Sequence, residues 1–363
     1  MEGRGVKAAV WFTTQCALIA KKDQALSAVF NFNMLRESMT IIGNEQKRAS
    51  LLNLARRSKL HHCLLFEGPS GIGKKNTAIW LAKILNCEEQ AAEPCNRCWH
   101  CKAIDGKEHP DIIEISPDPN LKTQVISVSQ ARQLIKRLQT HTFRAQWRVV
   151  IFDPAETMRP ATANALLKTF EEPPSFTIFI LICKSAYQLI TTIRSRSQRV
   201  RFVPVAEETM KEWLGKYNLG DNLPMILSLS EGCPQRALAL IDGELDIWRD
   251  LRKRFVAAVT QSTSQRFAFV KSFCTEESHN WDDLMDIIST VLYDTMLFQK
   301  CQSVCYNKDM QGLIEQWSNR IMPSNLNSIF QQLDQIKMDR RLNVNARLLL
   351  DSLMTNIHAG LRG

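Results

Sequence analysis

Three glycines, a lysine and a downstream aspartate are the residues of this chain best suited to holding a phosphate group. The glycine-rich loop covers residues 68–74, and its key members are Gly68, Gly71, Gly73 and Lys74. Glycines permit a tight backbone whose N–H groups face an anion, and a lysine ending such a loop can reach the outer phosphates. Asp153 directly follows an apolar run at 149–152, where a carboxylate can orient a metal ion. The spacing predicts the phosphate loop of a nucleotide-binding fold.

The same pattern lacks three groups that ATP hydrolysis requires. Lys75 stands where a serine or threonine hydroxyl would bind Mg²⁺, and an ammonium cannot bind a cation. Pro154 stands where a glutamate would activate water, and Glu156, two residues further along, is not expected to replace it. Cys183 ends the next apolar run, where a polar side chain would contact the γ-phosphate. We expect no hydrolysis. The motif leaves open whether ATP or ADP binds or the loop is a glycine turn without a ligand, and whether Asp153 contacts a metal or is only a strand-end carboxylate.

Four cysteines between the loop and the aspartate have the spacing of metal ligands. They are Cys87, Cys95, Cys98 and Cys101. Four thiolates complete the tetrahedral shell of Zn²⁺, and a complete shell leaves no position for a water molecule. The cluster predicts a structural zinc site, the alternative being unligated or redox-active cysteines. His100 and His109 lie nearby and are expected to be surface residues rather than ligands.

A short basic loop at 191–198 contains Arg196 between Ser195 and Ser197. A guanidinium projecting from such a loop can bind a phosphate on a neighbouring molecule, because its planar fork matches spread negative charge. From the spacing alone, an ordinary basic surface loop is the better interpretation.

The composition limits the class of partner and the location. The chain has 363 residues and a formal net charge of +9. This length fits two or three domains, and the charge indicates either an anionic partner such as nucleic acid or a solvated basic surface. Its eleven cysteines, without a recognisable signal peptide, argue against a secreted disulfide framework. No run of about 18 apolar residues occurs, so no membrane partner is expected, and the expected location is the cytoplasm.

The phosphate-loop residues are embedded in alternating strand and helix patterns. Apolar, β-branched runs occur at 63–66, 112–115, 149–152, 179–182 and 200–202. Helical patterns separate them at 77–85, 129–139 and 161–170. Continuous apolar runs are typical of strands buried on both faces, so the alternation predicts an α/β fold with a parallel sheet. Residues from about 246 onward have helical spacing and predict an all-α bundle.

Together these motifs resemble the bacterial clamp-loader family of AAA+ proteins, most closely its delta-prime branch in DNA polymerase III. The resemblance covers about 40–363. It is most specific in the run Asn-Ala-Leu-Leu-Lys-Thr-Phe-Glu-Glu-Pro-Pro at 164–174, in the four-cysteine module and in the Arg196 loop. The family usually carries Ser-Arg-Cys in that loop, so Ser197 departs from the pattern by one atom type.

The resemblance implies roles for two arginines and an order of domains. Arg196 would be an arginine finger, offered in trans to ATP on an adjacent motor subunit. Arg236 matches the second sensor position of a helical lid, although with hydrolysis impaired a structural surface residue is an equal alternative. The implied segments are an AAA+ domain at 39–205 with its zinc module at 87–101, a lid at 206–245 and an oligomerising collar at 246–363. From its own residues, the extension at 1–38 is expected to be dispensable or a start-site artefact.

The resemblance also implies a function. The replaced groups favour a stator, a non-catalytic subunit of a DNA-directed DNA polymerase holoenzyme that helps load the sliding clamp onto primed DNA with gamma/tau and delta subunits. One alternative is an active gamma/tau-type ATPase motor, which would carry serine or threonine at 75 and glutamate at 154. A further alternative is a free-standing, zinc-containing nucleic-acid binder, which would purify alone.

Overall fold

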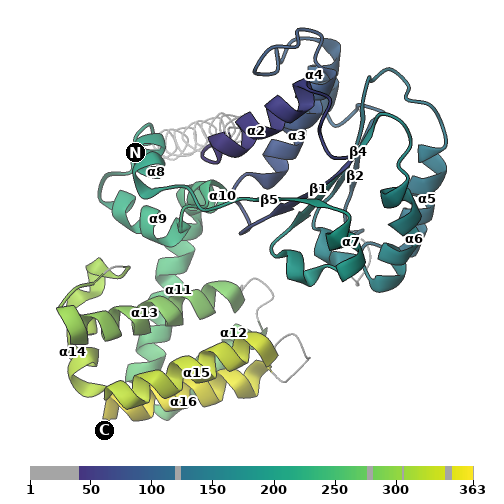
Figure 1. The fold of residues 1–363 in the computed structure, drawn as a ribbon. Coiled ribbons are helices and arrows are strands. Elements are labelled where there is room, and N and C mark those ends of the chain that lie inside the picture. The colour runs from purple at the N-terminus through teal and green to yellow at the C-terminus, as the bar shows by residue number, and fades with distance from the viewer. Residues whose placement is uncertain (1–40, 119–123, 276–280, 305, 340–345, 363) are drawn as a thin grey trace, which may run out of the picture. The chain divides into compact units, whose positions relative to one another are not determined.

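The computed structural model describes residues 41–118, 124–275, 281–304, 306–339 and 346–362 (Figure 1). The extension expected at 1–38 lies outside these residues. The described chain divides into two compact units. One holds the residues up to Met210 together with Gly232–Leu238, and the other holds Lys211–Glu231 and the residues from Ala239. The predicted segments at 39–205, 206–245 and 246–363 stay a prediction.

The first unit is built on a five-stranded parallel sheet in the order β2-β3-β4-β1-β5. Its strands are β1 (Cys63–Glu67), β2 (Ile112–Ile115), β3 (Arg148–Phe152), β4 (Thr177–Cys183) and β5 (Gln198–Arg201). Four of the five predicted ranges lie inside a strand, and the fifth, at 200–202, overlaps β5. The predicted α/β fold is therefore confirmed, and the carboxyl ends of all five strands meet at one edge.

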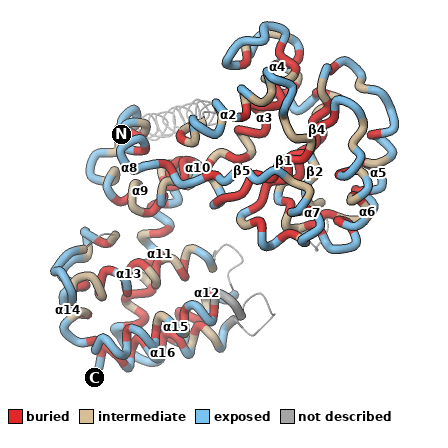
Figure 2. The backbone as a smooth tube through the Cα atoms, viewed as in Figure 1, coloured by how far each residue is buried: buried red, intermediate tan, exposed pale blue. Residues whose placement is uncertain are grey.

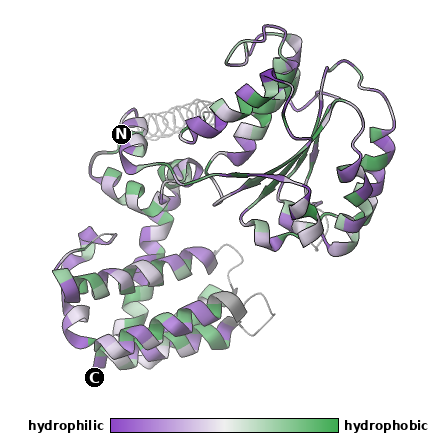
Figure 3. Ribbon diagram, in the orientation of Figure 1, coloured by the Kyte–Doolittle hydropathy of each residue, from purple (hydrophilic) through white to green (hydrophobic). Residues whose placement is uncertain are grey.

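Helices cover both faces of this sheet (Figure 1). One face packs against α2 (Glu45–Arg56), α3 (Lys74–Asn86) and α4 (Trp99–Asp105). The other packs against α5 (Val128–Leu138), α6 (Pro160–Glu171) and α7 (Thr191–Ser195). Alternate residues of one strand enter different cores, so that Leu64 faces α3 while Leu65 faces α6. The inner strands are consequently buried and hydrophobic along their length (Figures 2 and 3).

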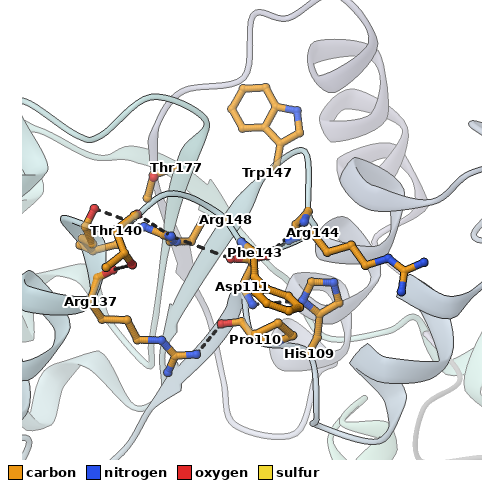
Figure 4. Close-up of polar contacts among 12 residues, drawn as sticks. His109, Pro110, Asp111, Arg137, Thr140, Phe143, Arg144, Trp147, Arg148 and Thr177 are labelled. Atoms are coloured by element: carbon orange, nitrogen blue, oxygen red, sulfur yellow. Dashed lines mark hydrogen bonds and ion pairs between the residues drawn. The ribbon is translucent and has the colours of Figure 1, made fainter.

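A buried aspartate fixes the loop that leads into β3 (Figure 4). Asp111 is 2% exposed, and its carboxylate accepts hydrogen bonds from the backbone N–H groups of Phe143, Arg144 and Ala145 at 2.9–3.0 Å. The Arg148 guanidinium lies 3.9 Å away. Burial alone would raise the pKa of Asp111, but these bonds and Arg148 hold that pKa below its usual value. The carboxylate thus accepts the hydrogen bonds of three loop N–H groups that would otherwise need water as their acceptor.

The described residues of the second unit form helices joined by short turns, with no strand among them. Its longer helices are α9 (Leu223–Ser230), α11 (Leu245–Thr260), α12 (Thr263–Thr275), α13 (Trp281–Cys301), α14 (Gln311–Arg320), α15 (Pro323–Asp339) and α16 (Ala346–Arg362). This confirms the predicted all-α region. The hydropathy and length of the described helices leave none that could span a membrane.

A buried polar network ties α11 and α13 to the segment before α14. Arg252 is 1% exposed and donates to Asn307 Oδ1 at 2.8 Å and to the Asp309 carboxylate. Asp294, fully buried on α13, accepts from the Asn307 N–H at 2.7 Å. Buried charges are stable only when paired in this way, so the network fixes one arrangement of the segment.

Candidate functional site

The phosphate loop connects the end of β1 to the start of α3. Gly68, Gly71 and Gly73 have φ values of 150°, 77° and 90°, which side-chain-bearing residues rarely adopt. A Cβ on Gly68 would also lie 2.6 Å from the carbonyl oxygen of Phe202. The backbone N–H of Gln235 in α10 (Pro234–Ala239) donates to Gly71 O at 3.1 Å, which ties that helix to the loop.

Lys74 turns into the loop itself. Its Nζ donates to Gly68 O and Pro69 O, each at 2.5 Å, and the residue is 7% exposed. Burial lowers the pKa of Lys74, and nearby Asp153 and Glu156 partly oppose that effect. The ammonium that would reach a phosphate is therefore bonded to backbone carbonyls of its own chain.

Lys75 lies between two carboxylates at the edge of the sheet. Its Nζ is 2.8 Å from Glu114 Oε2 on β2 and 3.8 Å from Asp153 Oδ2 after β3. Burial raises the pKa of Asp153, and Lys75 is the strongest of the nearby charges that counteract this rise. Asp153 is the carboxylate expected to orient a metal, and residue 75 is the position expected to bind it. A divalent cation would therefore share this space with the ammonium.

The remaining groups at this edge are Pro154, Glu156 and Cys183. Pro154 has no proton acceptor, as its sequence position indicated. Glu156 accepts a hydrogen bond from the Lys184 N–H at 3.3 Å, which places its carboxylate against the end of β4. Cys183, 2% exposed, has its pKa raised to about 12 by burial. It therefore stays a neutral thiol at physiological pH.

Glu67 and Glu114 are two carboxylates of this edge that the sequence analysis missed. Glu67 ends β1, accepts from the Ala186 N–H at 2.9 Å and pairs with Arg199 of β5 at 2.7 Å. Burial favours its neutral form, but these two bonds lower the pKa of Glu67 overall. The sequence feature that could have revealed them is a charged residue within or at the end of an otherwise apolar strand.

The predicted arginine finger lies on a different part of the unit. Arg196 caps the carboxyl end of α7 and is 37% exposed. Its Nη1 donates to Thr192 O at 3.0 Å, and its Nη2 lies 2.6 Å from Glu171 Oε1 on α6. Within the described residues its polar partners all belong to α6 and α7. The structure therefore does not bring Arg196 together with the phosphate loop of its own chain.

Arg236 is placed beside the phosphate loop. It is half-buried on α10, and its backbone nitrogen lies 3.7 Å from a Cβ built on Gly71. The predicted second-sensor residue and the predicted phosphate loop thus occupy one region of the first unit.

The four predicted cysteine ligands form one cluster. The Sγ atoms of Cys87, Cys95, Cys98 and Cys101 all lie within 4.8 Å of one another. Tetrahedral zinc with bonds of about 2.3 Å would separate its sulfurs by roughly 3.8 Å, so the cluster has suitable dimensions.

Backbone N–H groups already point at three of these sulfurs. The N–H groups of Cys95, Cys98 and Cys101 donate to the Sγ atoms of Cys87, Cys95 and Cys98, at 3.3–3.4 Å. Bonds from the backbone lower the pKa of Cys95 to about 7. These donors favour thiolates, the form that binds a metal.

The expectation that His100 and His109 are surface residues is wrong. They are 9% and 3% exposed, and His100 Nδ1 lies 3.0 Å from His109 Nε2. Trp99 packs on both rings, and the Arg144 guanidinium lies 4.4 Å from the centre of its ring. The polar character of histidine suggested exposure, but the hydrogen bond between the two rings allows both to be buried beneath the tryptophan.

The parallel sheet, glycine loop and flanking helices define the first unit as an AAA+-type nucleotide fold. Models of the family described as "DNA polymerase III, delta subunit" match residues 43–206 and, for its C-terminal part, 248–359. The chain belongs to this family of bacterial clamp-loader subunits.

Curated relatives fall in the delta-prime and tau branches. The DNA polymerase III delta-prime subunit of Escherichia coli is 28% identical over 82% of this chain and 89% of its own length. The delta-prime subunit of Bacillus subtilis is 28% identical over 85% and 94%. The tau subunit of B. subtilis is 31% identical over 63% of this chain and 41% of its own length. The predicted resemblance to the delta-prime branch is confirmed.

Proposed function

We propose that this chain is a delta-prime-like, non-hydrolysing subunit of a bacterial clamp loader. It would act with gamma/tau and delta subunits to place the ring-shaped sliding clamp on primed DNA in the cytoplasm. The match to delta-prime relatives over most of both chains supports this role. The net charge of +9 fits contact with DNA phosphates, made directly or through the complex.

The observation that carries the proposal is the ammonium of Lys75 between Glu114 and Asp153. A motor needs a divalent cation near that position to bridge the β- and γ-phosphates. In this chain the two carboxylates are already partly neutralised by a side chain, and Pro154 provides no base. The chain would therefore keep the nucleotide fold as a scaffold, without the groups that hydrolyse ATP.

Arg196 is the group that such a scaffold would contribute to chemistry. Its partly exposed position at the end of α7, away from its own phosphate loop, suits contact with a nucleotide held by a neighbouring subunit. A guanidinium supplied in trans stabilises the charge that develops on a transferring phosphoryl group. The chain would therefore activate a motor without being one.

The decisive experiment compares ATP turnover by the isolated chain with turnover by the reconstituted complex. We expect negligible hydrolysis by the isolated chain and DNA-stimulated hydrolysis by the complex. Lys74→Ala should change neither rate. Magnesium-dependent turnover by the isolated chain that Lys74→Ala abolishes would instead identify an active motor.

A gamma/tau-type motor is the second candidate, because tau relatives match 63% and 56% of the chain at 31% identity. The residues at 75 and 154 count against it. The chain also spans 41% of the B. subtilis tau subunit, against 94% of the delta-prime subunit of that species.

We propose that the four-cysteine cluster holds one structural Zn²⁺. Four thiolates would close its coordination shell, so the ion would cross-link the module rather than activate water. Metal analysis of reduced protein purified without chelator should give one zinc per chain. Cys101→Ser should lower this value and the midpoint of thermal unfolding, whereas Cys301→Ser, an exposed cysteine on α13, should change neither. A zinc content near zero in the unmutated chain would remove the site.

A further inference from the structure

The arginine loop contains an ion pair that the proposed function does not yet use. Arg196 Nη2 lies 2.6 Å from Glu171 Oε1, and the two side chains are 37% and 45% exposed. Glu171 is the last residue of α6 and belongs to the run at 164–174. The pair therefore joins two sequence motifs that are separated along the chain.

Glu171 is poorly placed to stabilise its own helix. The carboxyl end of a helix carries partial negative charge, so a carboxylate there is unfavourable. Lys168 precedes Glu171 by three residues on α6, but lysine on the amino-terminal side of glutamate is the weaker order for a helical pair. Among the described residues, the ion-pair partner of Glu171 is Arg196, which caps α7. The Glu171 carboxylate therefore stabilises the position of Arg196 rather than helix α6.

The guanidinium is held from two sides that differ in chemistry. Nη1 donates to Thr192 O at 3.0 Å and Ser195 Oγ at 3.4 Å, which are neutral groups of α7. Nη2 is bonded to a carboxylate. A phosphate oxygen binds a guanidinium through the same charge-assisted bonds, so it would compete with Glu171 for this nitrogen.

We propose that Glu171 is a positioning residue that restrains Arg196 until a phosphate replaces it. The carboxylate holds Nη2 in the free subunit, and a phosphate oxygen of a nucleotide on the neighbouring subunit takes its place in the assembled complex. The bonds to α7 keep the guanidinium oriented during this exchange. Both side chains are partly exposed, so water weakens the pair enough for the exchange. This inference rests on the proposed finger role of Arg196.

The first test measures ATP turnover by the reconstituted complex containing Glu171→Gln. The variant keeps the size of the side chain and removes the competing charge. We expect kcat/KM for ATP to rise about threefold, a change typical of an exposed ion pair, and the gain to shrink at high salt. Glu172→Gln is the matched control, because the neighbouring glutamate is exposed and forms no ion pair among the described residues. An unchanged or lower value for Glu171→Gln, or an equal rise for Glu172→Gln, contradicts the proposal.

A second measurement asks whether Glu171 acts through the arginine. In an Arg196→Ala background, Glu171→Gln should produce no further change in turnover. A gain that persists without Arg196 would mean that the glutamate acts on the fold or the surface charge, and would overturn the restraint.

The restraint is also measurable on the isolated full chain. Phenylglyoxal modifies accessible arginines, and peptide mass spectrometry reports the rate at each position. Arg196 should react faster in Glu171→Gln than in the unmutated chain, while Arg194 serves as an internal reference with unchanged rate. Equal rates at Arg196 overturn the restraint. If these rates differ but Arg196→Ala leaves turnover by the complex unchanged, the finger role fails and the ion pair stands.

Discussion

The phosphate loop and the arginine loop are both basic, but their cations are used in opposite ways. Lys74 bonds to carbonyls of the loop, and Lys75 bonds to Glu114 and lies beside Asp153. Arg196 is bonded at the surface, by one nitrogen to α7 and by the other to a half-exposed carboxylate. Lys74 is buried and bonded to its own loop, whereas Arg196 is partly exposed and, on our proposal, would exchange Glu171 for an anion.

The difference supports the proposal that this nucleotide fold is kept without ATP hydrolysis. The carbonyls and carboxylates around the phosphate loop are stabilised by cationic partners, because poorly solvated polar groups without partners are costly. Two lysines provide those partners within the chain. Arg196 is less constrained than Lys74, since its side chain is 37% exposed and water competes for its charge.

The largest expected effect is the loss of Arg196 from the reconstituted complex. Arg196→Ala should lower DNA-stimulated ATP turnover by at least about 100-fold, because arginine fingers contribute large factors to phosphoryl transfer. Assembly, followed by size-exclusion chromatography, should be unaffected. Arg194→Ala is the control, since Arg194 lies two residues away with its guanidinium 5.2 Å from the ring centre of Tyr187. If the complex with Arg196→Ala turns over ATP within twofold of the unmutated complex, Arg196 is not an arginine finger.

A smaller effect is expected from replacing Lys75 with a metal ligand. Lys75→Thr should allow Mg²⁺ to bind between Glu114 and Asp153. Thermal unfolding should then show stabilisation of about 1 kcal/mol at a magnesium concentration about five times its dissociation constant. No ATP turnover should appear, because Pro154 still supplies no base.

Lys75→Met is the matched control, since it removes the charge without adding an oxygen ligand. The unmutated chain should show no such response to magnesium. An equal magnesium-dependent rise in the unmutated chain would show that Lys75 does not occupy the position of the cation.

The smallest effect concerns the Glu67–Arg199 pair, which links the end of β1 near the phosphate loop to β5 after the arginine loop. The folded-state pKa of Glu67 lies below its ordinary value of 4.5. Its contribution to stability is therefore present above that value and is lost as the pH falls through 4.5 toward the folded-state pKa. Glu67→Gln should lower the free energy of unfolding at pH 7 by about 1 kcal/mol and flatten its decrease in acid.

Chemical denaturation at several pH values measures this effect. Glu315→Gln, on an exposed position of α14, should leave the pH dependence unchanged. An unaltered acid limb for Glu67→Gln would mean that the pair does not stabilise the sheet edge.

Sequence reasoning recovered the sheet because its strands are unusually easy to recognise. Strands buried on both faces read as continuous apolar runs, as in β4, where every residue is buried. The ends of those runs located Asp153 and Cys183 at the correct edge. The cysteine cluster was equally accessible, because its ligands lie close together along the chain.

The sequence by itself determined which groups are present: the glycines that shape the loop, the four clustered thiols, and the replacements at 75, 154 and 183. Only the tertiary structure decided which groups meet. Glu114 reaches Lys75, and Glu171 reaches Arg196, through helices and strands that are separated along the chain. Short-range spacing encodes local geometry, whereas the partner of a charged side chain depends on how separate elements pack, which no local pattern specifies.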